Sequence, residues 1–204
     1  MKHDRLHALT DGIFAIVMTI LVFGLRVPTL KVVNNQNLLS ELSKESKIFV
    51  SYLISFMLLF TYWRGHNFIV STVAKNLDMN LVNLNMLFLL LIGLVPFSSQ
   101  LVGTYPDTQV GLIIYALNII FIGLTLFAMR LYIDKSPSIE NEERQRHQNI
   151  NARIRVLTPV SCSILAIAAC FINTWLAFSL LLLGVIFNLY NNAADTTRKL
   201  LKIR

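Results

Sequence analysis

The sequence predicts an all-α integral membrane protein with six transmembrane helices, and three observations support this prediction. Of the 204 residues, 55% are hydrophobic and only 14% are charged, whereas soluble domains carry about a quarter charged residues. The mean hydropathy is +0.61. The charges fall in short segments between long apolar runs. Because these runs use most of the chain, we expect one six-helix domain over residues 1–204 and no soluble catalytic domain.

The six spans follow from the lengths of the apolar runs, because a bilayer core of roughly 30 Å takes about 20 apolar residues of helix. In the longest outer connection, Asn34–Asn37 indicates a turn. The segment at about 134–155 is expected to be a solvated, helical cytoplasmic linker that extends into the fifth span. The six runs lie at about Leu6–Leu25, Ile48–Val70, Leu81–Val102, Val110–Tyr132, Val156–Ile172 and Trp175–Tyr190.

The basic residues predict the orientation of the chain. With six spans, 14 of the 18 lysines and arginines fall on the side that holds both termini, and four fall in one loop on the other side. Positive charge concentrates on the cytoplasmic side of membrane proteins. We therefore expect a multi-pass protein with both termini in the cytoplasm. This asymmetry explains the pI of about 9.7, so the bilayer is the expected partner and nucleic acid is not.

Polar side chains inside membrane spans are the most informative ones. Asp11 lies within the first run, Trp63 and His66 share one face near the inner end of the second, and Asn85 lies near the inner end of the third. The topology brings all four to the cytoplasmic third of the membrane. We expect one hydrogen-bonded cluster in which the indole and imidazole N–H groups donate to the carboxylate. Two interpretations remain open, namely a staple between helices and a proton relay through Asp11 and His66.

The first span also carries a stripe of mainly apolar residues on one face. At 100° per residue the members of the stripe fall within an arc of roughly 100°, and Asp11 points away from that arc. Such a stripe usually marks helix packing, which its small residues also fit. The members of the stripe are Leu9, Gly12, Ile16, Thr19, Ile20 and Phe23.

Several of these residues belong to a spaced pattern. The segment Arg5-x-x-x-Leu9-Thr10-Asp11 resembles the first-helix signature, R-x-x-x-F-S-D, of the transmembrane protein 175 family of potassium channels, in its prokaryotic, single-repeat form. Leu9 and Thr10 replace the usual phenylalanine and serine, and Thr10 keeps the hydroxyl. The resemblance extends over three of six helices and adds Arg5 and Thr10 to the expected polar cluster. Its remaining elements are Trp63-x-x-His66, Asn85 and Val95-Pro96-Phe97.

The resemblance implies a passive potassium channel, built as a homotetramer whose first helices line a central pore. Carried over by position, the hydrophobic constriction of the family falls on Ile16, and a hydroxyl layer that holds K⁺ transiently falls on Thr19. Gly12, Ile20 and Phe23 continue the same face. No cofactor and no resident metal are implied, and K⁺ and other monovalent cations are the expected partners. An isoleucine neck gates by narrowing and dewetting, so selectivity for K⁺ over Na⁺ should be modest.

Three other functions compete with a channel. A proton-conducting or proton-coupled transporter would use Asp11 and His66. A purely structural membrane subunit would conduct nothing. A membrane enzyme is excluded, because beyond the Asp11–His66 pair the sequence offers no nucleophile with its base, no metal-ligand cluster and no glycine-rich phosphate loop.

Overall fold

The computed structural model describes residues 3–30, 32–73, 78–136 and 146–189, and within these ranges all regular structure is helical. Eight α-helices are joined by one 3₁₀ turn and one π-helical segment. In chain order the elements are α1 (His3–Ile20), the 3₁₀ turn η1 (Leu21–Gly24), α2 (Asn35–Lys44), α3 (Ser46–Asn67), the π-helix η2 (Phe68–Val73), α4 (Met79–Gly93), α5 (Val95–Thr104), α6 (Gln109–Asp134), α7 (Arg146–Cys170) and α8 (Thr174–Leu189).

The apolar helices agree with the predicted spans. Four stretches are long and apolar enough to cross a membrane, namely Arg5–Gly24, Ser46–Val70, Met79–Thr104 and Gln109–Asp134. Two shorter apolar helices follow at Val156–Cys170 and Thr174–Asn188. The described chain is therefore an all-helical membrane protein with four long spans and two shorter apolar helices.

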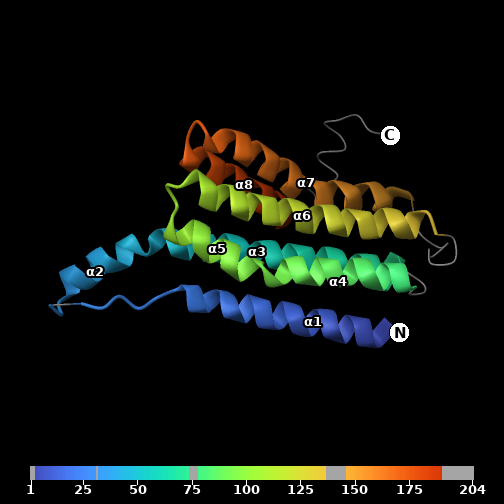
Figure 1. Cartoon of the computed structure of the whole chain (residues 1–204), viewed down its shortest axis with the longest axis horizontal. Helices are drawn as coiled ribbons and strands as arrows, with labels where there is room; N and C mark the ends of the chain where they lie inside the picture. The colour runs from blue at the N-terminus through green and yellow to red at the C-terminus, as the bar shows by residue number, and fades with distance from the viewer. Residues whose placement is uncertain (1–2, 31, 74–77, 137–145, 190–204) are drawn as a thin grey trace.

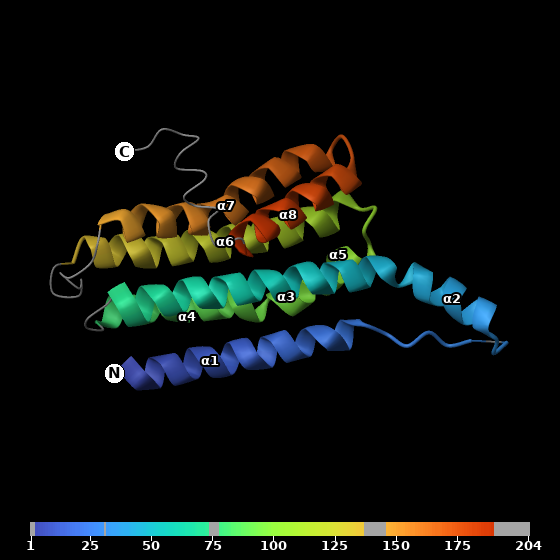
Figure 2. The same cartoon turned by 180° about the vertical axis from the view of Figure 1, so that it is seen from behind.

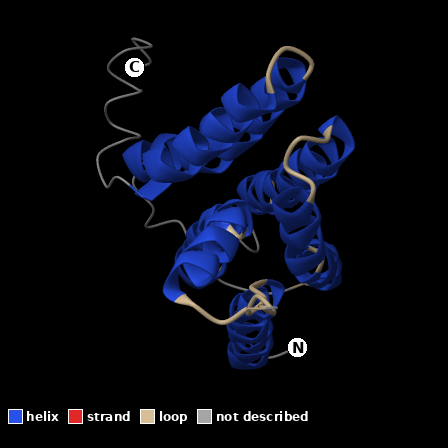
Figure 3. Ribbon diagram, turned by 90° about the vertical axis from the view of Figure 1, so that its left-hand side faces the viewer, coloured by secondary structure: helices blue, strands red, loops and turns tan. Residues whose placement is uncertain are grey.

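The helices run side by side along one long axis, with α1 at one edge of the bundle (Figures 1 and 2). α1 packs on α3, α4 and α5, while α7 and α8 form a hairpin that packs on α6 at the opposite edge. The end-on view separates the N-terminal helix from that hairpin by the helices between them (Figure 3). α2 projects beyond the end of the bundle that is opposite the N-terminus. α1 thus contacts the rest of the protomer through one side only.

Buried hydroxyl groups join the central helices. Ser55 Oγ lies 2.7 Å from Ser99 Oγ and 2.8 Å from Tyr115 OH, which connects α3, α5 and α6. Further along two of these helices, Tyr62 OH of α3 donates to the carbonyl oxygen of Ile119 of α6 at 3.0 Å. Each polar group finds its partner on a neighbouring helix, as the membrane interior requires. This layer fixes α3 and α5, the helices on which α1 rests.

The structure differs from the sequence prediction at two places. The third apolar run is broken at Leu94, because Pro96 in the first turn of α5 has no N–H to continue the hydrogen bonding of α4. Asn34 does not form the predicted turn with Asn37. It caps α2, and its Oδ1 accepts from the Asn37 N–H at 2.7 Å. Asparagine suits both turns and N-caps, so that prediction was wrong.

The linker predicted at about 134–155 lies partly outside the described residues, which omit 137–145. From Arg146 onward the linker is helical, and α7 continues without a break into the fifth apolar run.

Candidate functional site

The stripe predicted on the first span lies on the exposed side of α1. Ile16 and Phe23 are 58% and 78% exposed, and Leu9, Thr19 and Ile20 are exposed as well. The opposite side of α1 is buried against α3 and α4. The buried side consists of Leu6, Phe14, Val17 and Leu21.

Gly12 and Thr19 break the bulky apolar character of this exposed face. A Cβ atom built on Gly12 would meet no protein atom within 4 Å, so packing within the protomer does not require a glycine there. The Thr19 hydroxyl oxygen lies 3.0 Å from the Ala15 carbonyl oxygen and 2.8 Å from that of Ile16. Its hydrogen is therefore donated to the backbone, and its lone pairs remain available to a cation on the exposed side.

The predicted polar cluster consists of two separate pairs. Trp63 Nε1 donates to Asp11 Oδ1 at 2.8 Å, as expected, and joins α3 to α1. His66 Nε2 instead lies 2.6 Å from Asn85 Oδ1, which joins α3 to α4. Both His66 and Asn85 are buried, whereas Asp11 is exposed. The expected bond from the imidazole to the carboxylate is therefore not present.

The position of His66 explains the separation. Its ring stacks on Phe88 with 5.1 Å between centroids and 11° between planes. Phe88 lies one turn beyond Asn85 on α4, so the two side chains hold the ring by its face and its edge. Phe88 also packs against Phe14 of α1, with 6.0 Å between ring centroids. His66 therefore joins α3 to α4 through one amide and one aromatic contact, and Phe88 in turn contacts α1.

Arg5 and Thr10 do not join either pair. Arg5 is exposed, and no hydrogen bond or ion pair connects it to another described residue. Thr10 is buried, and its Oγ1 has no hydrogen-bond partner among the described residues. The cluster inferred from the sequence is smaller than expected.

Arg130 is a buried charge that the sequence analysis did not identify as a site residue. It lies on α6, is 1% exposed, and places its Nε 3.4 Å from Asp134 Oδ1. Its guanidinium also lies 5.9 Å from the centre of the Phe68 ring, at the start of the π-helix. The spacing of Arg130 and Asp134, four residues apart on one helix, was the signal for this pair.

Among the described residues, no group of three or more histidine, cysteine or acidic side chains is arranged to hold a metal ion. Asp11 is bonded to Trp63 and His66 to Asn85. The candidate site is therefore the exposed face of α1, which carries Thr19. One hydrogen-bonded pair joins α1 to α3, and a second joins α3 to α4.

Comparison with known proteins shows which fold and which family the chain resembles. Residues 5–96 match the family described as "Endosomal/lysosomal potassium channel TMEM175". The chain is 28% identical over 193 residues to a potassium channel of Chamaesiphon minutus, which covers 93% of this chain and 95% of the relative. The crystal structure of a lysosomal potassium-selective channel TMEM175 homolog from Chamaesiphon minutus superposes with a TM-score of 0.79. It is 26% identical and covers 92% of this chain and 96% of that one.

The chain resembles the TMEM175 family over residues 5–96, and a bacterial homolog over most of its length. The matched residues contain α1 from Arg5 onward and all of α3 and α4, and therefore the exposed stripe and both polar pairs. Since the TMEM175 family consists of ion channels, the prediction that the chain is not an enzyme is confirmed. A vertebrate relative named as an endosomal/lysosomal proton channel, from Danio rerio, is 26% identical over 147 residues. That match covers 71% of this chain and 28% of the relative.

Proposed function

We propose that the chain forms a passive potassium channel of the cell membrane, as a homotetramer whose four α1 helices line a central pore. The observation that carries the proposal is the exposure of the Ile16 face of α1 in a protomer that buries the opposite face. One copy of α1 cannot enclose a pore, so a closed ring of identical subunits is needed. The family match over residues 5–96 and the bacterial potassium channel among the relatives support the same function.

The exposed face of α1 differs from a lipid-facing surface in its composition. A lipid-facing helix gains most from bulky apolar side chains, whereas this face includes Gly12 and Thr19. A glycine lets helices approach closely around an axis, and a hydroxyl can replace a water ligand of a cation. Ile16, one turn before Thr19, then forms the hydrophobic constriction, and Ile20 and Phe23 continue the wall. Because few oxygens are present, preference for K⁺ over Na⁺ should be modest.

We propose that both termini lie in the cytoplasm, because positive charge concentrates on the side that holds them. In this orientation the Asp11–Trp63 and His66–Asn85 pairs lie in the cytoplasmic third of the membrane, and α2 lies outside. All 204 residues serve one channel domain.

Potassium flux from liposomes, combined with thiol accessibility, tests this function. We expect purified protein to release K⁺ without a proton gradient. Single cysteines at Ile16, Thr19 and Ile20 should react with a small cationic thiol reagent from the aqueous phase and lose flux on reaction. The native Cys162 and Cys170 are first replaced by alanine.

A cysteine at Leu165 is the matched control. Leu165 is 57% exposed, as Ile16 is, but it lies on α7 at the opposite edge of the bundle. It should face lipid and stay unreactive, because charged reagents do not enter hydrocarbon. Equal reaction rates at Leu165 and Ile16 would show that exposure on α1 does not mark a water-filled pore.

Proton conduction is a second candidate, supported by the vertebrate relatives that are named as proton channels. A relay through Asp11 and His66 would need a path between them, and their hydrogen bonds instead lead to Trp63 and Asn85. We therefore propose that the two pairs act as staples between helices.

Two substitutions of Asp11 separate these roles. Asp11→Asn removes the titrating group but keeps an oxygen acceptor for Trp63, so assembly and K⁺ flux should persist. Asp11→Ala removes the acceptor as well and should cost about 1 kcal/mol of stability, measured as a lower melting temperature in detergent. If Asp11→Asn instead abolishes proton flux and leaves the melting temperature unchanged, the relay is the better account.

A further inference from the structure

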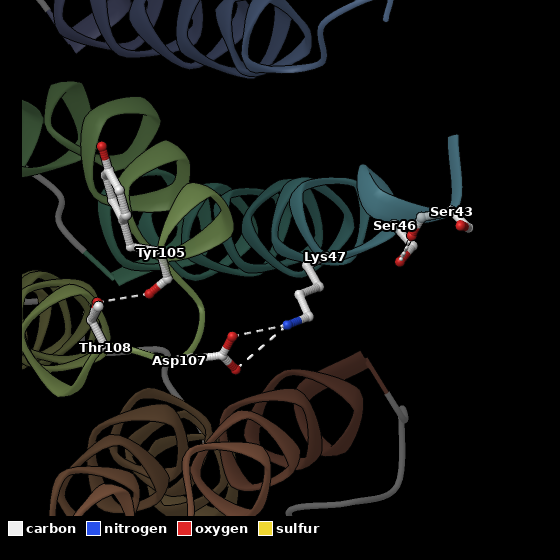
Figure 4. Close-up of polar contacts among 6 residues, drawn as sticks. All are labelled: Ser43, Ser46, Lys47, Tyr105, Asp107 and Thr108. Atoms are coloured by element: carbon white, nitrogen blue, oxygen red, sulfur yellow. Dashed lines mark hydrogen bonds and ion pairs between the residues drawn. The ribbon is translucent and has the colours of Figure 1, made fainter. Parts of the chain in front are cut away.

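A charge pair lies at the end of the bundle opposite the N-terminus, and both its members remain accessible. Lys47 Nζ lies 3.1 Å from Asp107 Oδ2 and 3.4 Å from Asp107 Oδ1 (Figure 4). The two side chains are 36% and 70% exposed. The ammonium of Lys47 also lies 5.2 Å from the centre of the Trp175 ring. The pair therefore joins the start of α3, the α5–α6 turn and the start of α8 without enclosing either charge.

An apolar groove of about 250 Å³ begins beside this pair and runs between α3 and α8. On the α3 wall, Ser46 and Lys47 lie at the mouth, and Val50 and Ile54 follow one and two turns further along. From Lys47 to Ile54 the wall is about 10 Å long at 1.5 Å per residue. That is roughly two-thirds of the hydrocarbon depth of one leaflet.

The α8 wall repeats the same order of polar and apolar groups. Trp175 lies at the mouth, Phe178 and Ser179 follow one turn on, and Leu182 follows after another turn. Tryptophan favours the boundary between headgroups and acyl chains. Both walls are thus polar at the membrane surface and apolar towards the membrane centre, which is the polarity of a phospholipid.

The paired charges at the mouth match a headgroup that also carries both charges. A phosphate can accept a hydrogen bond from Lys47, while a primary ammonium can donate to the exposed carboxylate of Asp107. A headgroup with a net negative charge would be repelled by the carboxylate of Asp107. A quaternary ammonium has no N–H to donate to it. We propose that the groove between α3 and α8 binds a phospholipid with an ethanolamine headgroup.

One wall of the groove is α8, which lies on the opposite side of the bundle from α1 (Figure 1). In a tetramer with α1 at the axis the groove faces lipid, and this placement rests on the proposed function. The binding chemistry does not, because it depends only on the groove and its charge pair.

Native mass spectrometry of the full-length protein, incubated with equimolar dioleoyl phosphatidylethanolamine and dioleoyl phosphatidylglycerol, tests the proposal. Wild type should retain the ethanolamine lipid several-fold over the glycerol lipid. Lys47→Met should reduce its retention about tenfold, and Asp107→Asn should bring the ratio of the two lipids close to one. Val50→Trp fills the groove from an exposed position and should abolish retention with the charge pair intact.

Lys135→Met is the matched control, since Lys135 is an exposed lysine at the other end of α6, and it should change nothing. Equal retention by wild type, Lys47→Met and Val50→Trp would overturn the site. Preferential retention of phosphatidylglycerol by wild type, or of phosphatidylcholine when it replaces phosphatidylglycerol in the mixture, would overturn the ethanolamine assignment. Lipid retention does not require conduction, so loss of K⁺ flux with normal retention would count against the proposed function alone.

Discussion

Replacing Ile16 by asparagine is expected to raise potassium flux several-fold and to reduce the discrimination between K⁺ and Na⁺. Asparagine is close to isoleucine in size but carries an amide that binds water. The constriction therefore keeps about the same diameter but becomes hydrated. A hydrophobic constriction limits flux by expelling water. A tenfold gain would correspond to a barrier lowered by about 1.4 kcal/mol. Concentrative or efflux assays in liposomes with each cation give both quantities.

Ile164→Asn provides the control for this substitution. Ile164 is 55% exposed, against 58% for Ile16, and it lies on α7 at the far edge of the protomer. The chemical change and the exposure are therefore matched, and flux should stay at the wild-type level. If wild type conducts and Ile16→Asn does not differ from it, the channel function stands and the constriction lies elsewhere. If folded, tetrameric protein does not conduct at all, the proposed function is lost.

The fold was largely predictable because four spans are long apolar runs and two are shorter ones, and hydropathy alone locates such runs. Helical phase grouped Ile16 and Thr19 on one face of α1, and the family resemblance implied that this face lines a pore rather than packs within the protomer. α2 was not predicted. Its amphipathic stretch is short, and Asn34, which caps it, is equally typical of a turn. The break at Leu94 was missed because hydropathy does not register the lost N–H of Pro96.

The polar cluster shows where sequence reasoning stops. Topology correctly brought Asp11 near Trp63, because each lies at the same depth on neighbouring helices. It could not choose between Asp11 and Asn85 as the partner of His66. That choice depends on the direction of the side chain within α3 and on the ring of Phe88, which the imidazole stacks against. Such a contact between helices has no signature in the spacing of a single sequence.

Replacing Gly103 by alanine is expected to destabilise the protein, because the added methyl group has no room between α5 and α3. Gly103 of α5 is buried against α3, and a Cβ atom there would meet Ser51 Oγ and would lie 3.0 Å from the Cα atom of Ile48. The second contact is with backbone, which cannot turn aside as a flexible side chain can. The helices must therefore separate, at a cost of about 1–3 kcal/mol.

This separation would also disturb the hydrogen bonds of Ser51, which donates to the Ser99 carbonyl oxygen at 3.1 Å. Thermal unfolding in detergent should show a melting temperature lowered by roughly 4–10 °C. Gly93→Ala is the control, because a Cβ atom at Gly93 would meet nothing within 4 Å, and it should melt like wild type. Adding Ser51→Ala to Gly103→Ala should recover part of the loss, since one of the two clashing atoms is removed. A Gly103→Ala protein that melts with wild type would mean that α3 and α5 are not in the close contact on which the position of α1 depends.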